Sequence, residues 1–159
     1  MAEYVYNPVQ LVQPNQPVLL RDSISCNKGY VYHRQESGTL TLRGIVNNSC
    51  GCFARYQLTF NGNIALPDGA IAPAPIAVAL AIDGEPILTS RAIVTPAATV
   101  TDPITTENFF NVTSTAIITV PRGCCENVSV ENVSEPLTPL TPAPAILVQN
   151  ANLTVTRIA

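Results

Sequence analysis

The second half of the chain is built from short segments in which apolar and polar residues alternate, with turn residues between them. From residue 75 onward it reads IAVALAI-DG-EPI, then NVTSTAIITV-PRG, then ENVSVENVS, then ILVQNANLTVTRI. Strict alternation is typical of strands that bury one face in a sheet, because successive side chains point to opposite sides. Thr, Val and Ile dominate these segments, and β-branched residues favour strands over helices. The pattern predicts an all-β chain.

Turn chemistry sets the boundaries between the strands. Asp83-Gly84 indicates a two-residue hairpin, because a type I′ turn needs positive φ at both central positions. Three stretches rich in Gly, Pro, Ala or Thr are predicted to be loops: residues 61–75, 96–107 and 135–144. The last strand is expected to bend near Asn150. The expected strands are Val18–Ser25, Tyr30–His33, Gly38–Arg43, Cys52–Phe60, Ile76–Ile82, Glu85–Thr95, Phe109–Val120, Cys124–Val133 and Ala145–Ile158. About eight to ten strands with long excursions between some of them favour a jelly-roll β-sandwich.

The N-terminal segment lacks this alternation. Residues 1–17 contain Tyr4, Tyr6 and three prolines, and proline blocks helix interiors and central strand positions. We therefore expect an extended N-terminal arm over residues 1–17 and one jelly-roll domain over residues 18–159. An arm with aromatic anchors either lies on a neighbouring molecule or is an end ordered only locally.

The amino-acid composition limits which classes of molecule the chain is expected to bind. Only 12% of the 159 residues are charged, against about 25% in typical soluble domains. The formal net charge of -3 provides no basic stripe for nucleic acid. No charged segment precedes a long apolar run, so neither a signal peptide nor a membrane span is expected. These features predict a chain made in a cytoplasm that stays there or leaves inside a larger particle.

Residues that could perform catalysis are sparse, and each has a structural explanation. Asp83 is explained by the hairpin turn, and Asp102 precedes a proline in ordinary loop chemistry. His33 is the only histidine, whereas a metal-dependent jelly-roll enzyme of the cupin type needs two or three histidines plus a carboxylate. We therefore expect no catalytic residues, no metal and no cofactor, and predict that the protein is not an enzyme.

The five cysteines are Cys26, Cys50, Cys52, Cys124 and Cys125. Their C-x-C and C-C spacings differ from the C-x-x-C pairs of zinc knuckles. Three interpretations stay open at this point. They are a four-cysteine metal site, buried or half-buried thiols, and one or two disulfides formed late.

The order of several motifs resembles a known family. RYQLTFNGNIA, IAVALAIDGEPI, ITVPRG, VSVENVS and ANLTVTRI follow one another as in the TNF-like jelly-roll heads of bacteria and phages. Such heads cap collagen-like surface and spore-coat proteins, and similar modules decorate phage capsids and fibres. The resemblance covers roughly residues 38–159. The Gly-X-Y stalk of the collagen-like proteins is missing, since the chain has eight glycines without that period.

The resemblance implies a function and a cellular setting. We expect a non-enzymatic structural protein, a homotrimeric component of a phage virion that decorates the capsid or forms a head fibre. It would be made in the bacterial host cytoplasm and bind the major capsid protein, or another virion protein, through the arm residues Tyr4, Tyr6 and Val9. The alternative is a receptor- or glycan-binding head on a spore, a bacterial cell surface or a fibre tip.

The resemblance also implies where the candidate residues lie. TNF-like jelly rolls pack the outer face of one sheet around a threefold axis, which makes Phe53, Thr115, Ile117, Leu147 and Gln149 the candidate trimer contacts. In that fold the strand that begins at Cys52 runs antiparallel to the strand that ends at Val120. Cys50, Cys52, Cys124 and Cys125 are therefore expected to cluster at one rim, with Cys26 elsewhere.

Overall fold

The computed structural model of the chain describes residues 1–23, 29–46, 51–67, 75–96 and 108–159. These residues form strands and one short 3-10 helix, which confirms the predicted all-β class. The strands are β1 (Ala2–Tyr6), β2 (Gln10–Val12), β3 (Asp22–Ser23), β4 (Val31–His33), β5 (Thr39–Arg43), β6 (Phe53–Ala65), β7 (Ile76–Ile82), β8 (Glu85–Pro86), β9 (Ala92–Val94), β10 (Phe110–Pro121), β11 (Cys125–Asn132) and β12 (Ile146–Arg157), and the 3-10 helix is η1 (Leu88–Ser90).

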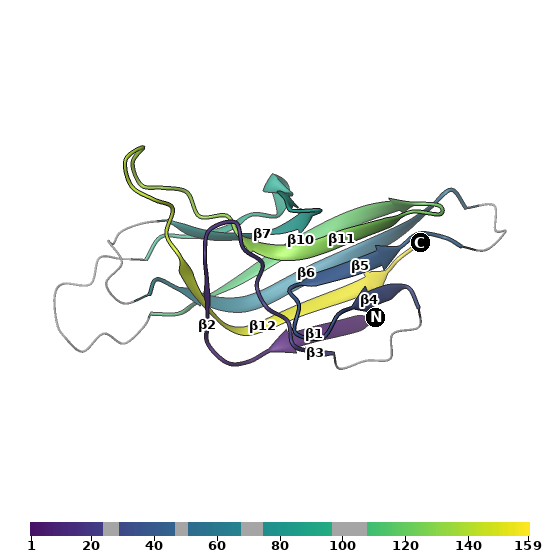
Figure 1. Cartoon of the computed structure of the whole chain (residues 1–159), viewed down its shortest axis with the longest axis horizontal. Coiled ribbons are helices and arrows are strands. Elements are labelled where there is room, and N and C mark those ends of the chain that lie inside the picture. The colour runs from purple at the N-terminus through teal and green to yellow at the C-terminus, as the bar shows by residue number, and fades with distance from the viewer. Residues whose placement is uncertain (24–28, 47–50, 68–74, 97–107) are drawn as a thin grey trace.

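The strands form two antiparallel sheets that pack as a sandwich (Figure 1). The first sheet has the order β10-β6-β12-β1-β3, and β2 also pairs with β12. The second sheet has the order β4-β5-β11-β7-β8, and β9 also pairs with β7. Consecutive strands β10 and β11 belong to different sheets, so the turn between them crosses the sandwich at one end.

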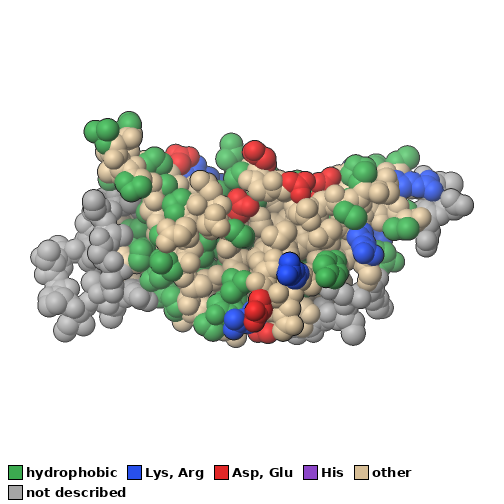
Figure 2. Space-filling view, viewed as in Figure 1, with side chains coloured by type: hydrophobic (Ala, Val, Ile, Leu, Met, Phe, Trp, Pro, Cys, Tyr) green, Lys and Arg blue, Asp and Glu red, His purple; other side chains and the backbone are tan. Residues whose placement is uncertain are grey.

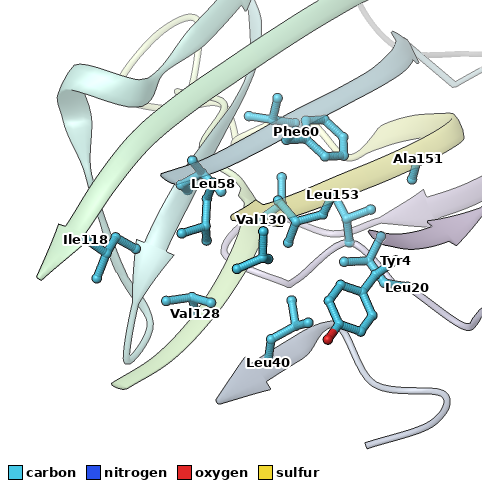
Figure 3. Close-up of a cluster of buried hydrophobic side chains, with 14 of the residues drawn as sticks. Tyr4, Leu20, Leu40, Leu58, Phe60, Ile118, Val128, Val130, Ala151 and Leu153 are labelled. Carbon is cyan, nitrogen blue, oxygen red and sulfur yellow. The ribbon is translucent and has the colours of Figure 1, made fainter. Parts of the chain in front are cut away.

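The core lies between the sheets and consists of the inward-facing side chains of the alternating strands. Leu58 and Phe60 of β6, Leu80 of β7 and Val130 of β11 are fully buried, and Figure 3 shows side chains of both sheets meeting in this layer. Tyr56 brings a polar group into this layer, and its hydroxyl proton is shared between the backbone carbonyls of Arg43 and Tyr30. Burying an aromatic hydroxyl requires such partners, because an unpaired one would lose its water contacts without replacement.

The prediction of a separate arm over residues 1–17 is wrong. β1 pairs with β12 along its whole length, from Ala2 opposite Val155 to Tyr6 opposite Ala151. Tyr4 is only 1% exposed and lies beside Leu20 and Leu40 in the core (Figure 3). The prolines that argued against a strand lie outside β1 and β2, so the ladder hydrogen bonds form without hindrance. The boundary between residues 17 and 18 therefore does not separate an arm from a domain.

The segment after β2 passes from one sheet to the other. The Val18 N–H donates to the Val130 carbonyl at 2.7 Å, whereas the Arg21 N–H donates to the Val5 carbonyl at 3.1 Å. The first contact belongs to the second sheet and the other to the first sheet. For this reason the expected strand Val18–Ser25 is reduced to the two-residue β3, with residues 24 and 25 outside the described part of the chain.

Two further strand boundaries differ from the prediction. β6 continues to Ala65 although residues 61–65 were expected to begin a loop, because both neighbours, β10 and β12, pair with it there. The expected strand Glu85–Thr95 is interrupted by η1, where the Ser90 hydroxyl accepts the Leu80 N–H at 2.9 Å. A side-chain oxygen thus takes the place of a ladder carbonyl at this edge of the second sheet.

Both predicted backbone irregularities are confirmed. Asp83 and Gly84 have φ of 50° and 83°, as a tight hairpin turn between β7 and β8 requires. β12 shifts register between Gln149 and Asn152, and Asn150 has φ of 54°. This irregularity lets one long strand pair with β2 at its start and β1 at its end.

Candidate self-association face

The three longest described strands, β6, β10 and β12, lie side by side in the first sheet, and apolar–polar alternation determines which of their residues face outward. Inward residues of β6, β10 and β12 fill the core, so every second residue of each strand faces away from it. The five predicted contact residues share this face. Phe53 lies on β6, Thr115 and Ile117 on β10, and Leu147 and Gln149 on β12.

Strand register places these five residues relative to one another. β10 and β6 are adjacent strands of this face. Across them, Ile117 is paired with Gln57 and Thr115 with Thr59. Gln149 and Leu147 pair with Asn63 and Ala65 at the other end of β6. Phe53 is opposite Pro121 at the end of the sheet where β6 begins. The candidates therefore cover the full length of the face.

The middle of the face is neutral and polar. The Asn111 amide donates to the side-chain oxygens of Asn61 at 2.8 Å and Asn63 at 3.1 Å. The Thr115 hydroxyl oxygen lies 3.4 Å from that of Thr59, its direct partner on the adjacent strand β6. These amides and hydroxyls hold one another in fixed positions while they keep free donor and acceptor capacity.

The two ends of the face are apolar. Ile117 is 62% exposed and Phe53 is 42% exposed, with the Arg55 guanidinium 5.0 Å from the centre of the Phe53 ring. At the opposite end, Leu11 of β2 pairs with Leu147 of β12 and is itself exposed. Sequence reasoning missed Leu11 because residues 1–17 were assigned to an arm, although the sequence QLV does alternate.

Charged groups are few on this face of the described strands. Alternation places Arg55 near one end of the face, Glu3 on β1, and Asp22 on the edge strand β3. In the view of Figure 2, charged side chains stand singly or in small groups among neutral ones. Low charge at the centre is a property of surfaces that become buried on association.

The predicted attachment residues do not form a common site. Tyr4 is buried against His33, with their ring centroids 4.9 Å apart. Tyr6 is half-buried below the Arg21 guanidinium, which lies 5.6 Å from its ring centre. Only Val9 of the three is exposed. Tyr4 is therefore corrected from a contact residue to a core residue.

The described cysteines lie at one end of the sandwich. β10 runs antiparallel to β6 with Pro121 opposite Phe53, which is the predicted strand pairing. The Cys52 carbonyl accepts the Arg122 N–H at 2.9 Å, so Cys52 lies beside the turn that carries Cys124 and Cys125. All three thiols are free and exposed. The placement of Cys26 and Cys50 lies outside the described residues.

The described residues contain no group of three or more His, Cys, Asp or Glu side chains arranged to hold a metal ion. The Nε2 atom of His33 lies 2.9 Å from the Ser37 carbonyl, so this ring is tied into its own hairpin. No helix in the described part of the chain is long and apolar enough to cross a membrane.

Comparisons with known proteins agree with this architecture. A scan against protein-family models gives no match, and a search of curated proteins gives none. Among solved structures, the globular domain of the zebrafish complement 1qA protein superposes with a TM-score of 0.53 at 14% identity, over 96% of this chain and 94% of that one. The predicted TNF-like jelly-roll fold, which the C1q globular domain shares, is thereby confirmed as the fold of this chain.

Proposed function

We propose that this chain is a non-enzymatic structural protein that assembles as a homotrimer through the outer face of its first sheet. The observation that carries the proposal is the gathering of Phe53, Thr115, Ile117, Leu147 and Gln149 on one face that is neutral in the middle and apolar at both ends. A sheet face that is low in charge at its centre and carries exposed apolar side chains suits a contact surface. Copies arranged around a closed symmetry axis can bury such a face completely.

The neutral middle of the face supports contact with a second copy of the chain. Burial of a charge without a partner costs several kcal/mol, whereas Thr and Asn side chains lose little if they find new hydrogen bonds. Asn61, Asn63 and Asn111 are already ordered by their mutual hydrogen bonds, so less side-chain freedom is lost when they are covered.

The proposal is tested by the mass of the purified full chain in solution under reducing conditions. Light scattering at micromolar concentration should give three times the 16.9 kDa chain mass. Ile117→Glu places a charge among the apolar residues at one end of the face and should lower the mass to that of one chain. The matched control, Leu140→Glu, changes a residue that is 96% exposed in the 135–144 loop and should leave the trimer intact. A monomeric wild-type protein, or a trimeric Ile117→Glu variant, would contradict the proposal.

We further propose that the trimer is a virion component, either a capsid decoration protein or a head fibre of a phage. Support comes from a small, weakly charged chain and from an order of motifs that resembles that of phage TNF-like heads. Attachment through residues 1–17 is not part of this proposal, because β1 and β2 belong to the first sheet. Mass spectrometry of purified virions tests it, since a structural component should be present in a fixed ratio to the capsid protein. Absence of the chain from virions of a phage that encodes it would overturn the assignment.

A receptor- or glycan-binding head is the second candidate. Tyr30 and Tyr32 are both exposed at β4, an edge strand of the second sheet, and the Arg157 guanidinium lies 4.4 Å from the Tyr30 ring centre. Exposed aromatic rings are typical of surfaces that bind sugars or peptides. A glycan array probed with wild-type protein and with Tyr32→Ala separates the two functions. Binding that Tyr32→Ala abolishes favours recognition, and no binding favours the structural role.

A further inference from the structure

Three free thiols of the described chain are exposed at the end of the sandwich where β10 crosses to β11. Cys52 precedes β6, Cys124 lies in the crossing turn, and Cys125 begins β11. Free cysteine is normally among the most buried residue types, because the thiol behaves as a small apolar group. Three exposed thiols at one end therefore depart from what packing alone would select. We call them the thiol rim.

The backbone under the thiol rim is held in a defined position. The Gly44 N–H donates to the Cys124 carbonyl at 2.9 Å, and the Cys124 N–H donates to the Pro121 carbonyl at 3.1 Å. A Cβ atom on Gly44 would lie 2.1 Å from the Pro121 carbonyl oxygen, so the two segments are in the closest contact that glycine allows. The thiols therefore project from a fixed turn and not from a loose chain end.

A bridge between Cys124 and Cys125 is disfavoured by geometry. The Cα atoms of adjacent residues are about 3.8 Å apart, whereas a disulfide usually spans about 4.4–6.8 Å. Adjacent residues entering a strand also point to opposite sides of it. The two thiols of this turn therefore do not consume each other, and each can react with another thiol.

The thiol rim also stays accessible if the first sheet is covered. Cys125 pairs with Arg43 in the second sheet, on the opposite layer from the self-association face. The C-terminus lies at the same end, since the Ala159 carbonyl accepts the Arg55 N–H at 2.9 Å (Figure 1). An assembly around the first sheet would display its thiol rims together at one end.

We propose that Cys124 and Cys125 form disulfides with the same turn of a second copy and thereby join two trimers end to end under oxidising conditions. The choice of copies from different trimers rests on the proposed function, because Cys125 belongs to the sheet that faces away from the threefold contact. The disulfide itself does not depend on the trimer.

The oxidant is a low-molecular-weight disulfide, and two exchange steps account for all electrons. A cysteine thiolate of one copy attacks the small disulfide, forms a mixed disulfide and releases one small thiolate. A thiolate of the second copy then attacks the protein sulfur of that mixed disulfide and releases the second small thiolate. The two protein thiols lose two electrons and two protons, and the two released small thiols carry them.

The experiment compares reduced and oxidised full-length protein. The chain is purified with reductant, transferred to buffer with oxidised glutathione near pH 8, and measured by light scattering and non-reducing gel electrophoresis. The expected result is a doubling of the mass from the reduced to the oxidised state, a covalent two-chain band, and a cross-linked peptide that contains Cys124 or Cys125. Reductant should restore the starting mass.

Cysteine-to-serine variants identify which sulfur atoms form the disulfide. The double variant Cys124→Ser/Cys125→Ser should abolish the doubling of the mass. The single variant Cys52→Ser should retain it, and so should the double variant Cys26→Ser/Cys50→Ser. An oxidised wild-type mass equal to the reduced mass would overturn the proposal, as would a bridge between Cys52 and Cys124 of the same chain. A reduced protein that is monomeric contradicts the proposed trimer alone. In that case a covalent dimer through Cys124 or Cys125 still supports the disulfide.

Discussion

The side-chain amide of Asn132 donates a hydrogen bond to the Val12 carbonyl at 3.0 Å, although 120 positions separate the two residues. The same amide group donates to the Pro144 carbonyl at 3.0 Å, and its oxygen accepts the Ser134 N–H at 3.0 Å. Asn132 is fully buried, so one side chain joins the N-terminal segment, the end of β11 and the approach to β12.

Replacement of Asn132 by Ala is expected to lower the free energy of unfolding by about 2–4 kcal/mol, because it leaves buried backbone groups without partners. Urea denaturation of the purified variant measures the loss. Asn127→Ala is the matched control, since Asn127 makes its side-chain bonds to Thr41 and Asp83 at the surface. Equal losses in the two variants would contradict the role assigned to Asn132.

Deletion of residues 1–6 is expected to unfold the chain or to remove most of its stability. The deletion strips β12 of a partner strand and empties the core volume of Tyr4, and loss of a large buried aromatic side chain alone costs about 3–5 kcal/mol. Thermal unfolding followed by circular dichroism checks this, with Tyr4→Phe as the conservative comparison. A truncated chain that melts at the wild-type temperature would show that β1 contributes nothing.

Stability is expected to fall as the pH rises above 10, in part because of Tyr56. Burial, the largest cause, raises the pKa of the Tyr56 hydroxyl above its ordinary value of 10. The folded state then holds its proton at pH values where the unfolded state has lost it, so the stabilisation is complete below pH 10 and disappears above it. Tyr56→Phe should reduce this pH dependence between pH 9 and 11, and should cost about 1–2 kcal/mol at neutral pH through the lost hydrogen bonds. Tyr32→Phe, at an exposed position, is the control and should leave the stability at neutral pH close to that of the wild type.

Gly44→Ala is expected to destabilise the fold by about 3 kcal/mol, because the added methyl group would collide with the Pro121 backbone and overpacked sites relax poorly. Gly84→Ala is the comparison, since φ of 83° makes it strained although open space surrounds it, and about 1 kcal/mol is expected there. Chemical denaturation of both variants ranks them. A larger loss for Gly84→Ala would show that the turn beside Gly44 can move aside.

The long alternating strands were predictable because their signal is local. β6, β10, β11 and β12 each begin within one residue of the predicted positions, and the hairpin at Asp83-Gly84 follows from backbone sterics alone. Their shared face could be assigned in the same way, since alternation fixes which residues lie on one side.

The integration of β1 was not predictable by the same reasoning. Five residues with Tyr4 and Tyr6 between polar neighbours and nearby prolines show too short an alternation, and the partner that stabilises them lies at the other end of the sequence. The interruption of the second sheet at η1 was missed for a related reason. It depends on the Ser90 hydroxyl bonding to Leu80, a tertiary contact that periodicity does not encode.

The pairing of Ala2 with Val155 also sets the order in which the protein can be built. A ribosome delivers β1 first and β12 last, so the first strand emerges without the neighbour that will hold it. The first sheet can close only after β12 has been synthesised, and such sequence-distant pairing is typical of slow folding. Until β12 has been synthesised, the apolar side chains of β1 and β6 lack this native neighbour and can contact the wrong strands.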